Sequence, residues 1–180
     1  MSVSDVDRVQ LQAASEADFA EIIALTNHAF RHTGDGASWN AEDMIAGDRI
    51  TESLLRDDLA AAPDGHLLIW RDEAGQHLGH VRLDPDPGGV WFLGMLTVRP
   101  DRQDQKLGRR LLAAAEDFAR ARGATRIRMT VVDKRETLIA WYLRRGYALT
   151  GETKPFPYGD DRIGIPTRDD LAFVVLERAL

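Results

Sequence analysis

Basic side chains gather in one short stretch of a chain whose formal net charge is −6. They are Arg99, Arg102, Lys106, Arg109 and Arg110, with Asp101 and Asp104 between them. A strongly helical run begins at Leu107, and cations at the start of a helix oppose its macrodipole. A bound anion would compensate them, because the first turn of a helix also offers free backbone N–H groups. The pattern therefore predicts a phosphate or pyrophosphate site, although a solvated charged loop would have the same spacing.

Two histidines could also take part in chemistry, whereas cysteine chemistry is excluded. His28 and His32 are four residues apart on an expected helix and can face one site. No third ligand accompanies them, so we expect no metal and favour a surface or acceptor-pocket role. The sequence has no cysteine, which excludes disulfides, thiolate metal sites and a cysteine nucleophile.

Length and composition predict one globular domain over residues 1–180. Apolar residues make up 44% and charged residues 29% of the 180 residues, an ordinary balance for a soluble domain. No apolar run is long enough to span a bilayer and the N-terminus lacks a signal-peptide core, so we expect a cytoplasmic protein without membrane contact. The acidic balance disfavours nucleic acid as a partner.

The first half of the chain reads as a mixture of helices and strands. Ser15 with Asp18 forms a capping box for a helix that runs to about Phe30. Two short helices are expected near residues 40–46 and 51–61. Strands are expected at residues 8–13, 66–71 and 76–83, the last two forming a hairpin.

The second half begins with a continuous apolar run at Val90–Val98, which predicts a strand buried on both faces. Gly94 within it predicts a bulge or a close backbone approach. Helices are expected at residues 107–122 and 136–145, ended by Gly123 and Gly146. Strands are expected at 126–132, 147–150 and 171–176, with a long loop at 154–166. This order predicts an α/β fold with a mixed sheet.

Two segments resemble motifs of the GNAT superfamily of N-acyltransferases. Residues 98–112 resemble its acyl-CoA loop, Gln/Arg-x-x-Gly-x-Gly/Ala, which follows Val-x-Pro at the end of the fourth strand. Gln103 matches the first position and Gly108 the last, while Lys106 takes the place of the middle glycine. The lysine keeps its backbone N–H available if its φ is negative, and its ammonium would be near a CoA phosphate; alternatively, it weakens cofactor binding.

The second segment, residues 138–147, resembles the family's Phe-Tyr-x-x-x-Gly-Phe sequence. Tyr142 precedes Gly146 by four residues, as the family's tyrosine does. Arg135 stands where many members carry an asparagine. The two segments occur in the family's order with a strand between them, and an ordered pair is more specific than either motif alone.

The resemblance implies a single-domain GNAT-like fold, with a mixed, mostly antiparallel sheet, splayed central strands and flanking helices. It implies acetyl-CoA as co-substrate and no metal. The implied cofactor-binding residues are Leu96, Thr97, Val98, Gln103, Asp104, Gln105, Lys106, Leu107, Gly108, Arg109 and Arg135. The implied catalytic groups are the backbone N–H near Leu96 as oxyanion donor and Tyr142 as general acid to the CoA thiolate.

No motif in the sequence identifies the general base that takes the proton from the amine. The strand segment 91–95 carries no titratable side chain, which leaves Glu152, Asp35 and His28 as candidates. The acceptor is expected between residues 30–39 and the loop at 154–166. Trp39, Phe156 and Tyr158 would give an apolar wall, and Asp35, Glu152, Asp160 and Asp161 would attract a cationic amine.

The resulting prediction is transfer of an acetyl group directly from acetyl-CoA to a primary amine of a small molecule. Acetylation of a protein or peptide amine is an alternative that needs an open groove. A non-catalytic acyl-CoA-binding module is another, favoured by Lys106 in the glycine position and opposed by Tyr142. Many members of the family form homodimers, so a dimer is expected.

Overall fold

The computed structural model describes residues 8–34, 37–38 and 41–180, in which two sheets are present. The larger has seven strands in the order β1-β3-β4-β5-β6-β9-β7, and the smaller pairs β2 with β8. The strands of the large sheet are β1 (Leu11–Ala13), β3 (His66–Arg71), β4 (His77–Asp86), β5 (Val90–Val98), β6 (Arg126–Val132), β7 (Ala148–Pro155) and β9 (Ala172–Ala179). The small sheet contains β2 (Ile45–Ala46) and β8 (Ile165–Pro166).

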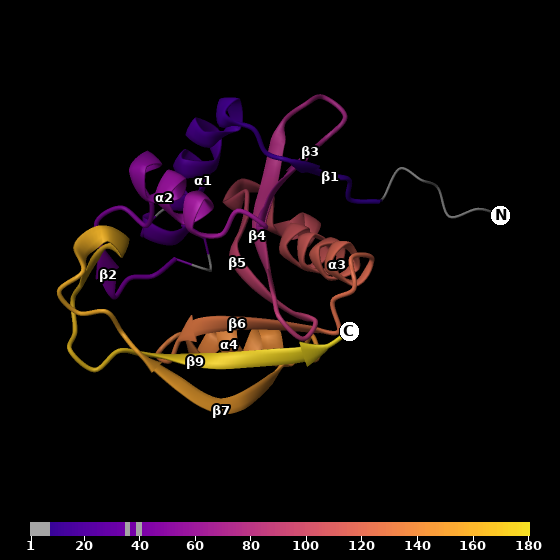
Figure 1. The fold of residues 1–180 in the computed structure, drawn as a ribbon. Coiled ribbons are helices and arrows are strands. Elements are labelled where there is room, and N and C mark those ends of the chain that lie inside the picture. Colours follow the sequence, from indigo (N-terminus) through magenta and orange to yellow (C-terminus); the bar gives the residue numbers. More distant parts are fainter. Residues whose placement is uncertain (1–7, 35–36, 39–40) are drawn as a thin grey trace.

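The large sheet opens at its centre. Every neighbouring pair is antiparallel except β5 and β6, which are parallel and pair only over residues 90–92 of β5. Beyond Phe92 the two strands separate, and Figure 1 shows β6, β9 and β7 running at a wide angle to β3, β4 and β5. This confirms the predicted mixed, mostly antiparallel sheet with splayed central strands.

Four helices in the described residues cover the two faces of the sheet. They are α1 (Phe19–Arg31), α2 (Glu52–Ala61), α3 (Leu107–Arg120) and α4 (Glu136–Leu143). Side chains of a strand alternate between faces, and on β3 Leu67 and Ile69 join the core under α1 and α2, whereas Leu68 and Trp70 join the core that contains residues of α3 and α4. None of the described helices is long and apolar enough to cross a membrane.

The helix starts follow the sequence signals. Ser15 and Asp18 form the predicted capping box, with the Ser15 N–H donating to Asp18 Oδ2 at 2.8 Å, and a short 3-10 turn then leads into α1. Thr51 caps α2 by accepting from the Leu54 N–H at 3.2 Å. The described helices therefore confirm the predictions for α1 and α2.

The predicted irregularity in β5 lies where the strands separate. The register between β4 and β5 shifts between His80 and Arg82, opposite Thr97 and Gly94, and Met95 has a φ of +53°. This confirms a bulge. The prediction that β5 is buried on both faces is wrong beyond Leu93, because β6 has turned away: Gly94 is exposed and Leu96 only part-buried.

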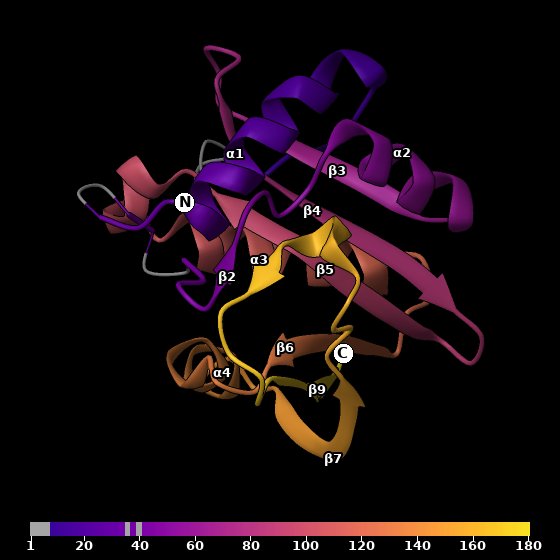
Figure 2. The ribbon, with the colours of Figure 1, turned by 90° about the vertical axis from the view of Figure 1, so that its left-hand side faces the viewer.

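The helix predicted near residues 40–46 is wrong; positions 39 and 40 lie outside the described residues. The Glu42 N–H donates to the Phe30 carbonyl at 2.7 Å, and Ile45 and Ala46 form β2. Its partner β8 lies within residues 154–166, which were expected to form a loop. The strand expected at residues 147–150 is longer than predicted, because β7 continues to Pro155. Tertiary pairing has overridden the local pattern. Figure 2 shows the β2–β8 ribbon in front of β5, on the open side of the sheet.

Candidate active site

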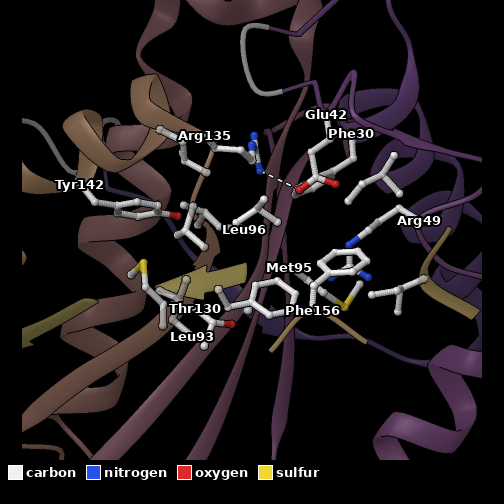
Figure 3. A pocket seen from close by; sticks show the side chains of 18 of the residues that line it. Phe30, Glu42, Arg49, Leu93, Met95, Leu96, Thr130, Arg135, Tyr142 and Phe156 are labelled. Carbon is white, nitrogen blue, oxygen red and sulfur yellow. Dashed lines mark hydrogen bonds and ion pairs between the residues drawn. The ribbon is translucent and has the colours of Figure 1, made fainter. Parts of the chain in front are cut away.

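A cavity of about 330 Å³ lies where β5 and β6 separate. β5 contributes residues 93–96 and β6 contributes residues 129–132. The remaining walls come from the end of α1, from Ile45 of β2, from α4 and from residues between the elements, so side chains of several segments surround the gap in the sheet (Figure 3). We call this space the acceptor cavity. Its apolar lining includes Phe30, Ile45, Leu93, Met95, Phe156 and Phe173.

Glu42 is the centre of the charged part of the acceptor cavity and is only 7% exposed. One carboxylate oxygen accepts from Arg135 Nη1 at 2.9 Å and the other from Arg31 Nη1. Arg31 also donates to the carbonyls of Gly47 at 2.9 Å and Ile163 at 2.8 Å. These bonds fasten the β2–β8 ribbon to the end of α1.

Arg49 enters the acceptor cavity from the side opposite Tyr142 (Figure 3). Its backbone is held by Asn27 of α1: Asn27 Oδ1 accepts from the N–H groups of Arg49 at 2.8 Å and Ile50 at 3.0 Å, and Asn27 Nδ2 donates to the Ile50 carbonyl at 2.9 Å. Burial lowers the pKa of the Arg49 guanidinium below its ordinary value. Sequence reasoning did not find Arg31, Glu42 or Arg49, since nothing local marks them.

Tyr142 is 5% exposed and directs its hydroxyl into the acceptor cavity (Figure 3). Burial raises its pKa well above the ordinary value, an effect that the charges of Arg135 and Arg145 oppose. The hydroxyl therefore keeps its proton across the neutral range.

Tyr142 also lines a second, narrow space that we call the slot. Leu96 and Leu138 share both linings with it, so these three residues stand where the acceptor cavity and the slot meet. The rest of the slot is lined by Ala29, Ser38, Thr97, Val98, Gly108 and Trp141. The slot thus runs beside the open edge of β5 and includes the first turn of α3.

The N-terminus of α3 suits an anion. Its first turn contains no acidic residue, and no side-chain hydrogen bond from Lys106 caps it. Lys106 adopts φ +55° and ψ +33°, so the negative φ on which an available Lys106 N–H depended is not present. The chain enters α3 through a left-handed residue, the conformation that glycine adopts without strain, and the lysine retains that geometry.

Most of the basic cluster is engaged away from the start of α3. Arg99 pairs with Asp101 at 2.8 Å, and Arg102 Nη1 lies 3.9 Å from Asp72. Arg110 lies over the Trp70 ring at 5.0 Å, and Arg109 lines a separate hollow with Arg144 and Arg145. Gln105 and Lys106 are exposed, whereas the side chains of Gln103 and Asp104 lie outside the described structure. The surplus charge at this helix start is therefore smaller than the sequence suggests.

Some other predicted site residues lie elsewhere. Arg135 lines the acceptor cavity and not the slot. His28 and His32 stack with ring centroids 4.8 Å apart, and neither lines the acceptor cavity. Glu152 is exposed near Arg128 at 3.6 Å, and Asp160 pairs with Arg162 at 2.7 Å.

The expected apolar wall is present in part. Phe30 and Phe156 line the acceptor cavity. Tyr158 lies 5.0 Å from Phe156, but it is 44% exposed and donates its hydroxyl to the Arg168 carbonyl at 3.0 Å. Asp35 and Trp39 lie outside the described residues.

A parallel pair of strands separates here beside a helix N-terminus, and a cavity lies at the point of separation. A helix N-terminus is suited to an anion, and a cavity of this size to a small ligand. The model of the acetyltransferase (GNAT) family matches residues 21–147. The chain belongs to this family of acetyltransferases.

Individual relatives agree with this assignment. An IAA acetyltransferase of Azospirillum brasilense is 33% identical over 115 residues, which cover 62% of this chain and 72% of the relative. A mycothiol acetyltransferase of Stackebrandtia nassauensis is 28% identical over 136 residues, 72% of this chain but 41% of the relative. The structure of a GNAT acetyltransferase from Elizabethkingia anophelis with acetyl-CoA bound superposes with a TM-score of 0.64 at 14% identity, covering 98% of this chain and all of the other. At that identity the likeness concerns the fold alone.

Proposed function

We propose that this protein transfers the acetyl group of acetyl-CoA directly to the primary amine of a small molecule. The observation that carries the proposal is the shared lining of Leu96, Leu138 and Tyr142, at which the slot and the acceptor cavity adjoin. A thioester in the slot and an amine in the cavity would meet at these residues. Proximity of this kind is a main source of rate enhancement.

The co-substrate is proposed to lie along β5 and end at α3. From Leu93 to Val98 the edge of β5 that faces β6 has no strand partner in the described chain, so the amides of a pantetheine arm can pair there. The pyrophosphate would meet the free N–H groups of Leu107, Gly108 and Arg109, with the Lys106 ammonium nearby. Thr97, Gln103, Asp104 and Gln105 complete the proposed set.

The chemistry needs an oxyanion donor and a proton for the leaving group. As the amine nitrogen bonds to the thioester carbon, charge develops on the carbonyl oxygen, and the Leu96 N–H is proposed to donate to it. The C–S bond then breaks, and Tyr142 gives its hydroxyl proton to the CoA sulfur. The proton lost by the amine regenerates the tyrosine through water.

Removal of the amine proton is assigned to water and not to Glu42. Among the described residues that line the acceptor cavity, Glu42 carries the one carboxylate. Each of its oxygens already accepts from an arginine, Arg31 or Arg135. We therefore propose that Glu42 positions these arginines.

The acceptor is proposed to be a small molecule because the end of α1, Ile45 of β2 and Ile163 add walls to the cavity between β5 and β6. Its volume is at the lower end of ordinary ligand sites. The Azospirillum relative is likewise an IAA acetyltransferase and is not named as an acetyltransferase of proteins. A protein or peptide tail would need an open groove at this position.

The proposal is tested by following thiol release from acetyl-CoA with a panel of primary amines, polyamines and a lysine-containing peptide. We expect turnover with at least one small amine and none with the peptide. Tight CoA binding without thiol release from any amine would overturn the proposal in favour of a non-catalytic module. Turnover confined to the peptide would instead show a protein acetyltransferase.

A further inference from the structure

The acceptor cavity carries a surplus of positive charge. Three guanidinium groups line it, those of Arg31, Arg49 and Arg135, against the single carboxylate of Glu42 among the described lining residues. This is the reverse of the acidic site expected from the sequence. Charges in a partly dry cavity interact more strongly than on the surface, so a cationic group entering beside these arginines would be repelled.

Two of the three arginines already have protein partners. Arg31 donates to Glu42 and to two backbone carbonyls, and Arg135 donates to Glu42. Their bonds neutralise Glu42 and hold the walls together. The surplus charge is therefore concentrated on Arg49.

Arg49 is placed to serve a ligand. In the described residues no hydrogen bond or ion pair reaches its guanidinium, which lies 5.8 Å from the centre of the Phe30 ring. Its backbone is fixed to α1 through Asn27, so the side chain starts from a rigid point. Arg49 is part-buried, and this partial loss of water lowers the pKa of its guanidinium. An anion beside it would compensate that loss.

We propose that Arg49 binds a carboxylate of the acceptor, so that the substrate class is a primary amine that also carries an acid group, as an amino acid does. This inference rests on the proposed function. The geometry also gives the rest of the substrate a place: Phe30, Met95 and Phe156 offer an apolar surface for its side chain. Tyr142 stands on the opposite side of the cavity, where the amine must meet the thioester.

The test compares three acceptors with the same apolar side chain: an amino acid, its primary amide and the amine that lacks the carboxylate. In the wild-type protein kcat/KM for the acid should exceed that for the other two by about 10- to 150-fold, the range for a hydrogen bond to a charged group. Arg49→Gln should remove this preference, and Arg49→Lys should restore part of it. Arg120→Gln, at an exposed pair on α3, is the matched control and should change nothing.

A binding measurement separates this inference from the proposed function. The N-acetylated amino acid should bind the wild-type protein more tightly than the N-acetylated amide by calorimetry, and Arg49→Gln should bind both equally. This difference in binding would support the role of Arg49 even if no acceptor caused thiol release. The absence of thiol release would overturn only the proposed transfer reaction. Equal turnover and equal binding of acid and amide by the wild type would overturn the role of Arg49 while leaving transfer intact.

Discussion

Glu42 and Arg135, far apart in the sequence, meet across the acceptor cavity with Oε1 accepting from Nη1 at 2.9 Å. Glu42 precedes β2, whereas Arg135 is the residue before α4. Both side chains are 8% exposed. The pair therefore ties the ribbon on the open side of the sheet to the helix that carries Tyr142.

Loss of the Glu42 carboxylate should destabilise the fold. Glu42→Ala leaves Arg31 and Arg135 buried without their anion, which costs about 3–5 kcal/mol in comparable buried pairs. Urea unfolding measures the change. Glu152→Ala, at an exposed pair with Arg128, is the control and should cost less than about 1 kcal/mol. Equal losses in the two variants would show that the buried pair contributes no more than a surface one.

Removal of the Tyr142 hydroxyl should slow chemistry without weakening cofactor binding. Tyr142→Phe should lower kcat by about 10²–10⁴-fold, the usual contribution of a general acid, with an unchanged dissociation constant for CoA. Tyr158→Phe removes a hydroxyl outside the cavity, which bonds the Arg168 carbonyl and the Leu171 N–H, and serves as the control. If kcat of Tyr142→Phe is within twofold of the wild-type value, or about equal to kcat of Tyr158→Phe, Tyr142 is not the general acid.

Lys106→Gly tests the left-handed residue at the start of α3. A non-glycine residue in this conformation costs about 1–2 kcal/mol, and glycine loses about 0.5–1 kcal/mol in chain entropy, so the variant should be more stable by roughly 0.5–1 kcal/mol. We expect weaker CoA binding with a smaller dependence on salt, because one ammonium near the phosphates is lost. Tighter CoA binding by the variant would show instead that the lysine side chain obstructs the site.

Stability should fall as the pH drops below about 6.5, through His80. This residue is fully buried between Thr26 at 2.8 Å and His77 at 3.1 Å, and burial holds its pKa well below the ordinary value. Below pH 6.5 the unfolded chain binds a proton that the native state rejects, so unfolding is favoured by up to about 1.4 kcal/mol per pH unit. The pKa of His77 is lowered too, so it contributes in the same window.

Urea unfolding at several pH values between 7.5 and 5 measures this slope. His80→Gln should flatten it, whatever its effect on stability at pH 7.5. An unchanged slope in that variant would show that His80 is not the group that titrates.

The elements with strong local signals were predictable from the sequence. The apolar stripe from Leu107, with Gly123 at its end, specified α3, and the run Val90–Val98 specified β5. The two motif segments indicated the family, which the match over residues 21–147 confirms. These predictions succeed because hydrophobic period, caps and motifs are properties of neighbouring residues.

The acceptor cavity was not predictable in the same way. Arg31, Glu42, Arg49 and Arg135 come from separate segments, and each is a single charged residue in an ordinary surrounding. Tertiary contacts bring them together: the β2–β8 pairing, the bond from the Glu42 N–H to the Phe30 carbonyl, and the bond from the Arg49 N–H to Asn27. The strands β2 and β8 are too short to give a periodic pattern. The helix predicted near residues 40–46 failed for the same reason: its backbone groups bond to α1 and β8 instead of to one another.

The structure of the complex with CoA tests the central claim most directly, since that claim places the thioester at Leu96 and Tyr142, where the slot and the acceptor cavity adjoin. The account predicts the pyrophosphate on the first-turn N–H groups of α3, the pantetheine along the open edge of β5, and the sulfur within about 3.5 Å of the Tyr142 hydroxyl. A sulfur outside the junction of the slot and the cavity, or a pyrophosphate away from α3, would contradict it.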